Sequence, residues 1–166
     1  MTLVYLGLGS NLGNRRLNLT EAFHHLSLLE KSEKLRSSRI YESNPVDGSD
    51  QPLYLNSVVE FETELLPEEL LSDCAEIENL MGRHRNPENR FEARVIDIDI
   101  LFFGTETIKT EKLTVPHYDI QNRSFFLKPM MDLNPDFIHP VMNLPVSELY
   151  KQLETKLNIH EFVLDY

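Results

Sequence analysis

Hydrophobic and polar positions change their spacing several times along the chain, and each change predicts a new element. Residues 3–9 (LVYLGLG) are rich in β-forming side chains and end on glycine, which predicts a strand. Apolar residues then recur near helical spacing over about 14–30, which predicts a helix. Two further strands are expected over 35–43 and over 53–65, separated by the turn-rich segment NPVDGSDQP.

The second half of the chain opens with the clearest helix. Pro67 begins it, Glu68 and Glu69 occupy its first turn, and Gly82 follows its last turn. An arginine-rich loop comes next. The loop leads into a strand over 94–104 (RVIDIDILFFG). Apart from two aspartates, this segment has the composition of a buried strand.

Beyond that strand the pattern predicts a short helix near 124–132 and an amphipathic segment near 146–157. The core order is therefore β-α-β-β-α-β with a C-terminal extension. This order suits an α+β, ferredoxin-like sandwich, in which helices pack on an antiparallel sheet. We expect residues 1–166 to form a single domain. Because this architecture hosts many chemistries, function has to be argued from particular residues.

Composition narrows the classes of partner. The 166 residues carry 16 Lys and Arg against 27 Asp and Glu, a net charge of −11, which makes a nucleic-acid-binding surface a poor candidate. No apolar run approaches the roughly 20 residues that cross a bilayer, and the N-terminus lacks the features of a signal peptide. The single cysteine, Cys74, excludes an intramolecular disulfide. We therefore expect a cytoplasmic protein with no membrane partner.

Two aspartates interrupt the most hydrophobic strand. Asp97 and Asp99 alternate with isoleucines, so the strand period of two places both carboxylates on one face, about 7 Å apart, and the isoleucines on the other. A partly buried pair of like charges is costly unless a cation lies between them. Oxygen ligands in this number suit Mg²⁺, which takes further ligands from water and substrate phosphates. The alternative is a half-exposed strand whose polar residues face water.

The loop before this strand is basic although the chain is acidic. Residues 83–94 (RHRNPENRFEAR) hold four arginines against two glutamates. Arginine forks match phosphate oxygens and stay charged near neutral pH. Beside the acidic pair they supply the groups needed for phosphoryl transfer, in which a protein mainly positions groups and neutralises charge. The alternative is a solvated loop whose arginines pair with Glu88 and Glu92.

Two more segments could contact a ligand. In LTVPHYDIQNRSF, His117 could contact phosphate or transfer a proton, and Arg123 could bind phosphate; the alternative is a loop with a structural histidine. Tyr54 and Asn56 share one strand face, and a ring plus a carboxamide suits a flat heterocycle, although Tyr54 could equally be core. Neither a P-loop nor a dinucleotide-binding glycine motif is present, and GLGSNLGN lacks the P-loop lysine.

The chain resembles the 6-hydroxymethyl-7,8-dihydropterin pyrophosphokinase family of folate biosynthesis in four segments: GLGSNLGN, YESNPVDGSDQPLYLN, GRHRNPENRFEARVIDIDILFFG and LTVPHYDIQNRSFFLKPM. The resemblance runs from residue 7 to about 130. It implies a single-domain ferredoxin-like enzyme, expected to be a monomer. Such an enzyme transfers the β,γ-diphosphate of ATP to the hydroxymethyl group of the dihydropterin and releases AMP.

The resemblance also implies the residues of the site. Asp97 and Asp99 would bind two Mg²⁺ ions that bridge the ATP phosphates. Arg85 and Arg94 would contact the phosphates and act in catalysis, with Arg83 in a supporting role. The other residues expected beside ATP are Glu78, Ile100 through its backbone, Lys112, Thr114, His117, Tyr118 and Arg123. Those expected beside the pterin are Ser43, Val46, Tyr54, Asn56, Phe91 and Phe125.

Several positions depart from the family pattern: Asn44 and Val46 in the pterin loop, Ile96 before the first aspartate, and three positions of the arginine-rich loop. The usual loop reads R-W-G-P-R, whereas this chain has RFEAR: Phe91 keeps an aromatic ring without the indole N–H, and Glu92 adds a negative charge. We expect altered loop kinetics and affinity rather than an altered reaction. Two other hypotheses stay open: a D-x-D nucleotidyl transferase or cyclase on a ferredoxin-like fold, which would release pyrophosphate, and a non-catalytic regulatory domain of the same fold.

Overall fold

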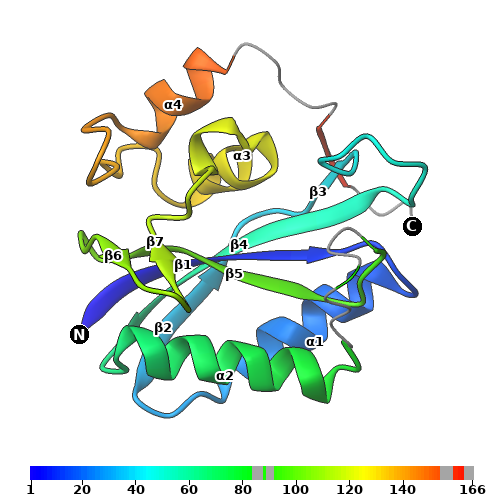
Figure 1. Cartoon of the computed structure of the whole chain (residues 1–166), viewed down its shortest axis with the longest axis horizontal. Helices are drawn as coiled ribbons and strands as arrows, with labels where there is room; N and C mark the ends of the chain where they lie inside the picture. The colour runs from blue at the N-terminus through cyan, green and yellow to red at the C-terminus, as the bar shows by residue number, and fades with distance from the viewer. Residues whose placement is uncertain (84–87, 89–91, 154–158, 163–166) are drawn as a thin grey trace.

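The computed structural model describes residues 1–83, 88, 92–153 and 159–162. Within these residues one six-stranded antiparallel sheet runs in the order β5-β1-β4-β3-β8, and β2 pairs with β4 beside β3 (Figure 1). The strands of this sheet are β1 (Thr2–Ser10), β2 (Ser32–Ser37), β3 (Tyr41–Ser43), β4 (Tyr54–Thr63), β5 (Asp97–Phe103) and β8 (His160–Glu161). A hairpin of β6 (Ile108–Lys109) and β7 (Thr114–Val115) lies beside it.

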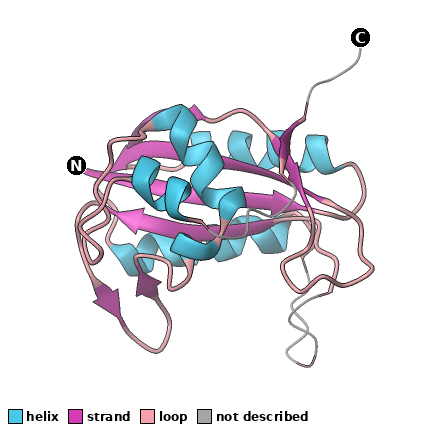
Figure 2. Ribbon diagram, turned by 90° about the horizontal axis from the view of Figure 1, so that it is seen from above, coloured by secondary structure: helices cyan, strands magenta, loops and turns pink. Residues whose placement is uncertain are grey.

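Helices cover both faces of the sheet. Figure 1 shows α1 and α2 on one face and α3 and α4 on the other, and Figure 2 shows the same layers from above. The α-helices are α1 (Arg15–Ser27), α2 (Pro67–Leu80), α3 (Ser124–Leu133) and α4 (Val146–Gln152), and a 3₁₀ helix spans Ile120–Asn122. The predicted α+β sandwich with helices packed on an antiparallel sheet is therefore confirmed. Of the helices that are described, none has the length and hydrophobicity to cross a membrane.

Each face of the sheet has its own hydrophobic core. Leu6 and Ile98 lie in the core beneath α1 and α2. Tyr5 and Phe102 lie in the second core, with Leu127 of α3. The C-terminal extension thus covers the face that the β-α-β-β-α-β core leaves open (Figure 1).

The two long helices begin and end where local chemistry favours it. The Asn14 side chain accepts a hydrogen bond from the Leu17 N–H at 3.1 Å and caps α1. Glu69 in the first turn of α2 accepts one from the Leu66 N–H at 2.7 Å. Gly82 follows α2 with a φ of 87°, a conformation that glycine adopts without strain. The predicted helix from Pro67 is therefore confirmed.

The prediction of one strand over 35–43 is wrong, because two short strands lie along the same edge of β4. The register between β2 and β4 ends at Ser37, and β3 begins at Tyr41. Between them the Ser38 hydroxyl accepts a hydrogen bond from the Val58 N–H at 2.9 Å. A serine side chain that takes over a backbone hydrogen bond in this way interrupts the regular ladder.

Candidate active site

The floor of the candidate site is the centre of the sheet, on the face covered by α3. Gly7 and Gly9 face this side, since Leu6 and Leu8 of the same strand lie in the opposite core. A Cβ atom on Gly7 would lie 2.5 Å from Cε1 of Phe126, so only glycine lets this ring approach the strand. Gly7 and Gly9 of the segment GLGSNLGN therefore shape a flat floor of the cavity.

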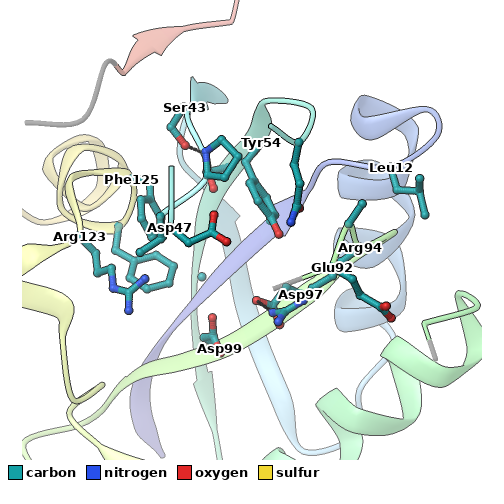
Figure 3. Close-up of a pocket in the computed structure, with 18 of the residues that line it drawn as sticks. Leu12, Ser43, Asp47, Tyr54, Glu92, Arg94, Asp97, Asp99, Arg123 and Phe125 are labelled. Carbon is teal, nitrogen blue, oxygen red and sulfur yellow. Dashed lines mark hydrogen bonds and ion pairs between the residues drawn. The ribbon is translucent and has the colours of Figure 1, made fainter. Parts of the chain in front are cut away.

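A cavity of about 920 Å³ opens above this floor. Its walls are the start of α3, the loop 44–53 and the segment that precedes β5 (Figure 3). Asp97 and Asp99 both line it, whereas Ile98 lies in the core on the other side of the sheet. The predicted split of carboxylates and isoleucines between two faces of one strand is confirmed.

Arginines surround the first carboxylate. Arg83 Nη1 lies 2.7 Å from Asp97 Oδ1, and Arg94 Nη1 lies 2.9 Å from Asp97 Oδ2. Arg83 also forms an ion pair with Glu78, whose side chain is buried in α2. Each carboxylate oxygen of Asp97 thus has its own guanidinium partner.

The second carboxylate is in a different state. Burial, together with the neighbouring negative charge of Asp97, raises the pKa of Asp99 to about 7. Near neutral pH this carboxyl is therefore partly protonated, and a bound cation would displace the proton. Among the described residues no group of three or more His, Cys, Asp and Glu side chains could hold a metal ion. A hard divalent ion here would have to take most of its ligands from water or from a substrate.

His117 is a neutral hydrogen-bonding group. Burial, helped by the positive charge of Arg123, lowers the pKa of His117 to about 4. Its Nδ1 accepts a hydrogen bond from the Asp119 N–H at 3.2 Å, so the ring proton lies on Nε2. Arg123 is fixed in turn, with Nε 2.8 Å from Asp119 Oδ2. This wall of the cavity offers one cation and one neutral donor.

The other end of the cavity is aromatic and polar. Tyr54 comes from β4 and Phe125 from α3, so the two rings approach the cavity from different elements (Figure 3). Asn56, with 4% of its surface exposed, donates through Nδ2 to Ser43 Oγ at 2.7 Å and to the Tyr41 carbonyl at 3.3 Å. These bonds fix the orientation of the carboxamide beside the two rings. Such an arrangement suits a flat heterocycle.

Comparison with known proteins agrees with this geometry. The model of the family described as 7,8-dihydro-6-hydroxymethylpterin-pyrophosphokinase (HPPK) matches residues 5–135. The chain belongs to the HPPK family. The 2-amino-4-hydroxy-6-hydroxymethyldihydropteridine pyrophosphokinase of Haemophilus influenzae is 40% identical over 152 residues, which cover 92% of this chain and 93% of the relative. The protein of the same name from Aquifex aeolicus is 39% identical over 150 residues, which cover 89% of this chain and 90% of that relative.

Solved structures share the fold at lower sequence identity. A Plasmodium falciparum HPPK-DHPS superposes with a TM-score of 0.71 at 18% identity, covering 91% of this chain and 45% of that chain. The HPPK chain described here therefore spans less than half the length of that protein. At this identity the likeness shows the ferredoxin-like HPPK fold alone.

Several residues predicted from the family pattern lie outside the cavity. The side chain of Ile100 is buried in the core beneath α1 and α2, which leaves only its backbone for a ligand. Lys112 and Thr114 are exposed on the β6–β7 hairpin and do not line the cavity. Arg85 and Phe91 lie outside the described residues. Their parts in ATP or pterin binding stay predictions.

Other predicted residues do line the cavity. Besides the groups above, Val46 and Tyr118 are among the lining side chains, and both are exposed, at 46% and 66%. Glu78 does not line the cavity, but it forms an ion pair with Arg83, which does.

Three features of the site are not among the residues that the sequence predicts. Asp47 directs its carboxylate into the cavity from the loop 44–53 (Figure 3). Asn11, which is buried, accepts a hydrogen bond from the Arg94 N–H at 2.7 Å and donates to Gln51 Oε1 at 3.1 Å. It therefore ties the two loops together. A polar residue directly after a buried strand is the signal that could have found it. The flat glycine floor is the third feature.

Proposed function

We propose that this chain transfers the β,γ-diphosphate of ATP to the hydroxymethyl group of 6-hydroxymethyl-7,8-dihydropterin and releases AMP. The observation that carries the proposal is the division of one cavity into two chemically different ends. Asp97 and Asp99 lie at one end, and Tyr54 and Phe125 lie at the other (Figure 3). A phosphate chain and a flat ring can then meet above the glycine floor.

The phosphate end is suited to charge neutralisation. Arg83 and Arg94 already lie within hydrogen-bonding distance of Asp97, and Arg123 borders the same cavity. Guanidinium groups in this position can bind phosphate oxygens and stabilise the charge that develops during transfer. His117 adds a neutral Nε2–H donor, which can hydrogen-bond phosphate without a change in its own charge.

The donor set fits the predicted metal. Asp97 and Asp99 offer carboxylate oxygens only, which is the chemistry that Mg²⁺ prefers, and they leave room for substrate ligands. Bound by these two aspartates, two Mg²⁺ ions would neutralise the ATP phosphates and bring the β-phosphorus and the pterin hydroxyl together. Asp99 would release its proton as a cation binds, because its raised pKa leaves it partly protonated near neutral pH.

The pterin end would hold the acceptor. Tyr54 and Phe125 would stack on the ring, and Asn56 with the segment from Ser43 to Val46 would recognise its polar edge. Orientation of the hydroxymethyl group toward the charged end then converts transfer into an effectively unimolecular step.

The direct test is product analysis. The protein is incubated with ATP, Mg²⁺ and 6-hydroxymethyl-7,8-dihydropterin, and nucleotides are separated over time. AMP should form in step with a pyrophosphorylated pterin. Release of pyrophosphate would instead favour the nucleotidyl transferase hypothesis, and binding of the pterin without turnover would favour a regulatory domain.

We also propose that residues 1–166 act as one domain, as a monomer and in the cytoplasm. The support is that two cores share one continuous sheet, and that the single cysteine, Cys74, is buried and free. Gel filtration with light scattering tests the oligomeric state.

A further inference from the structure

Arg15 occupies an unusual position for a positive charge. It is the first residue of α1, at the end where the helix dipole disfavours a cation. Its Nη1 donates to Glu42 Oε2 and to the Leu53 carbonyl, both at 2.8 Å. The side chains of Arg15 and Glu42 are only 26% and 17% exposed. Contacts outside the helix, and not helix formation, therefore account for this arginine.

The two acceptors mark the two ends of one loop. Glu42 immediately precedes Ser43, where the chain leaves β3, and Leu53 immediately precedes Tyr54, where it enters β4. The loop between them carries cavity-lining residues. One guanidinium group thus joins the point at which the loop departs to the point at which it returns.

The C-terminal strand supports this contact from the other side. β8 pairs with β3 so that His160 lies opposite Glu42, and His160 Nε2 is 3.1 Å from Glu42 Oε1. The Phe162 N–H donates to the Ile40 carbonyl at 2.8 Å, and the Phe162 ring centre lies 5.9 Å from Arg15 Cζ. We call Arg15, Glu42, the Leu53 carbonyl, His160 and Phe162 the Arg15 clasp.

We propose that Arg15 is a positioning residue for the aromatic end of the cavity. Through the clasp it holds Ser43 and Tyr54 in their bound arrangement before a ligand enters. A site whose walls are already ordered loses less entropy on binding, so loss of the clasp weakens binding at that end. The contacts of the clasp described above do not reach Asp97 or Asp99, so the chemical step keeps its groups. The identity of the ligand at this end rests on the proposed function.

The test compares Arg15→Ala with Arg16→Ala. Arg16 is the next residue of the same helix and is exposed, so both variants remove one positive charge from the same turn. Arg15→Ala should raise KM for the dihydropterin about tenfold and leave kcat and KM for ATP within about twofold, the pattern of lost uniform binding. Arg16→Ala should leave all three unchanged. Arg15→Lys should restore part of the effect, since an ammonium group replaces the charge but not the planar fork.

Two kinetic outcomes would overturn the proposal. One is an equal KM for the dihydropterin in Arg15→Ala and Arg16→Ala. The other is a lower kcat together with a higher KM for both substrates and a lower melting temperature in Arg15→Ala. That pattern would indicate a merely structural role.

A measurement without ligand separates this proposal from the proposed function. Amide hydrogen exchange of Arg15→Ala should be faster than wild type around Ser43 and Tyr54 and unchanged in β5. Truncation after Ile159 removes β8 and should also make exchange around Ser43 and Tyr54 faster, by a smaller factor. If the wild type forms no AMP with the dihydropterin, the proposed function fails. Hydrogen exchange of Arg15→Ala still tests whether the Arg15 clasp orders Ser43 and Tyr54. If exchange at Ser43 and Tyr54 is unchanged in Arg15→Ala, the clasp fails whatever the substrate is.

Discussion

The two faces of the sheet are made from the same strands but have opposite chemistry. On the side of α1 and α2, Leu6, Leu8 and Ile98 fill a closed core. On the side of α3, the neighbouring positions hold Gly7 and Asp99, which line the cavity. The difference follows from the strand period of two, which sends alternate residues to opposite faces. Stability and ligand binding can therefore be perturbed separately by changing adjacent residues.

The largest expected effect comes from the cavity face. Asp99→Asn keeps the shape of the side chain and removes its charge, and Asp97→Asn does the same for its neighbour. Each should lower kcat/KM for the proposed transfer by more than about 100-fold, because loss of a group that merely supports a metal ligand already costs about 10- to 100-fold. Steady-state assays of AMP formation measure this, and circular dichroism should show an unchanged fold. Retention of most of the activity in either variant would contradict the metal assignment.

The next effect comes from the core face. Ile98 lies between the two aspartates and is 5% exposed in the closed core. Ile98→Ala should lower the free energy of unfolding by about 2–4 kcal/mol through lost burial and a residual cavity. Urea unfolding measures the loss. Activity per folded molecule should change little, in contrast to Asp99→Asn. An activity loss as large as that of Asp99→Asn would show that stability and activity cannot be changed separately on the two faces.

The glycine floor gives a sharper comparison within the cavity face. A Cβ on Gly7 would lie 2.5 Å from the Phe126 ring, whereas one on Gly9 would lie 3.5 Å from Asn56 and Tyr54. Gly7→Ala should therefore destabilise the protein by roughly 1–3 kcal/mol, the usual cost of overpacking. Gly9→Ala should leave stability within about 0.5 kcal/mol and raise KM for the dihydropterin, since it narrows the floor. Thermal unfolding and steady-state kinetics check the pair; equal melting temperatures would contradict the packing argument.

Local patterns in the sequence were sufficient for most of the fold. The helix from Pro67 to Leu80 has a proline and an acidic first turn at its start and a glycine directly after its end, so its bounds are predictable. The break between β2 and β3 is not, because it depends on a hydrogen bond between Ser38 and Val58, which lie 20 positions apart. No local pattern in the sequence contains that contact.

The same distinction holds for the site. Asp97 and Asp99 could be predicted to share a face, since strand alternation is a local rule. The tie from Asn11 to the Arg94 backbone spans 83 positions, and the contact of Arg15 with Glu42 spans 27. Long-range contacts of this kind are set by how the elements pack, and spacing along the chain does not determine them.

The smallest expected effect tests the electrostatic side of the comparison. The raised pKa of Asp99, about 7, means that folding opposes its ionisation. Below about pH 4 both the folded and the unfolded states hold the proton, so the charge has no effect on stability. As pH rises from about 4 to 7 the unfolded state ionises first, and the wild type loses stability relative to Asp99→Asn.

The difference in stability between the wild type and Asp99→Asn should therefore open between about pH 4 and pH 7 in the absence of Mg²⁺ and reach about 1 kcal/mol. This is well below the roughly 4 kcal/mol that three pKa units would give, because Asp99 keeps some contact with water. Urea unfolding of both proteins across this range measures it. Asp47→Asn is a control of opposite sign, since hydrogen bonds from Ser49 lower the pKa of Asp47 and its charge favours folding. A gap that stays constant with pH would show that the Asp99 charge does not oppose folding, and that the two faces differ in shape alone.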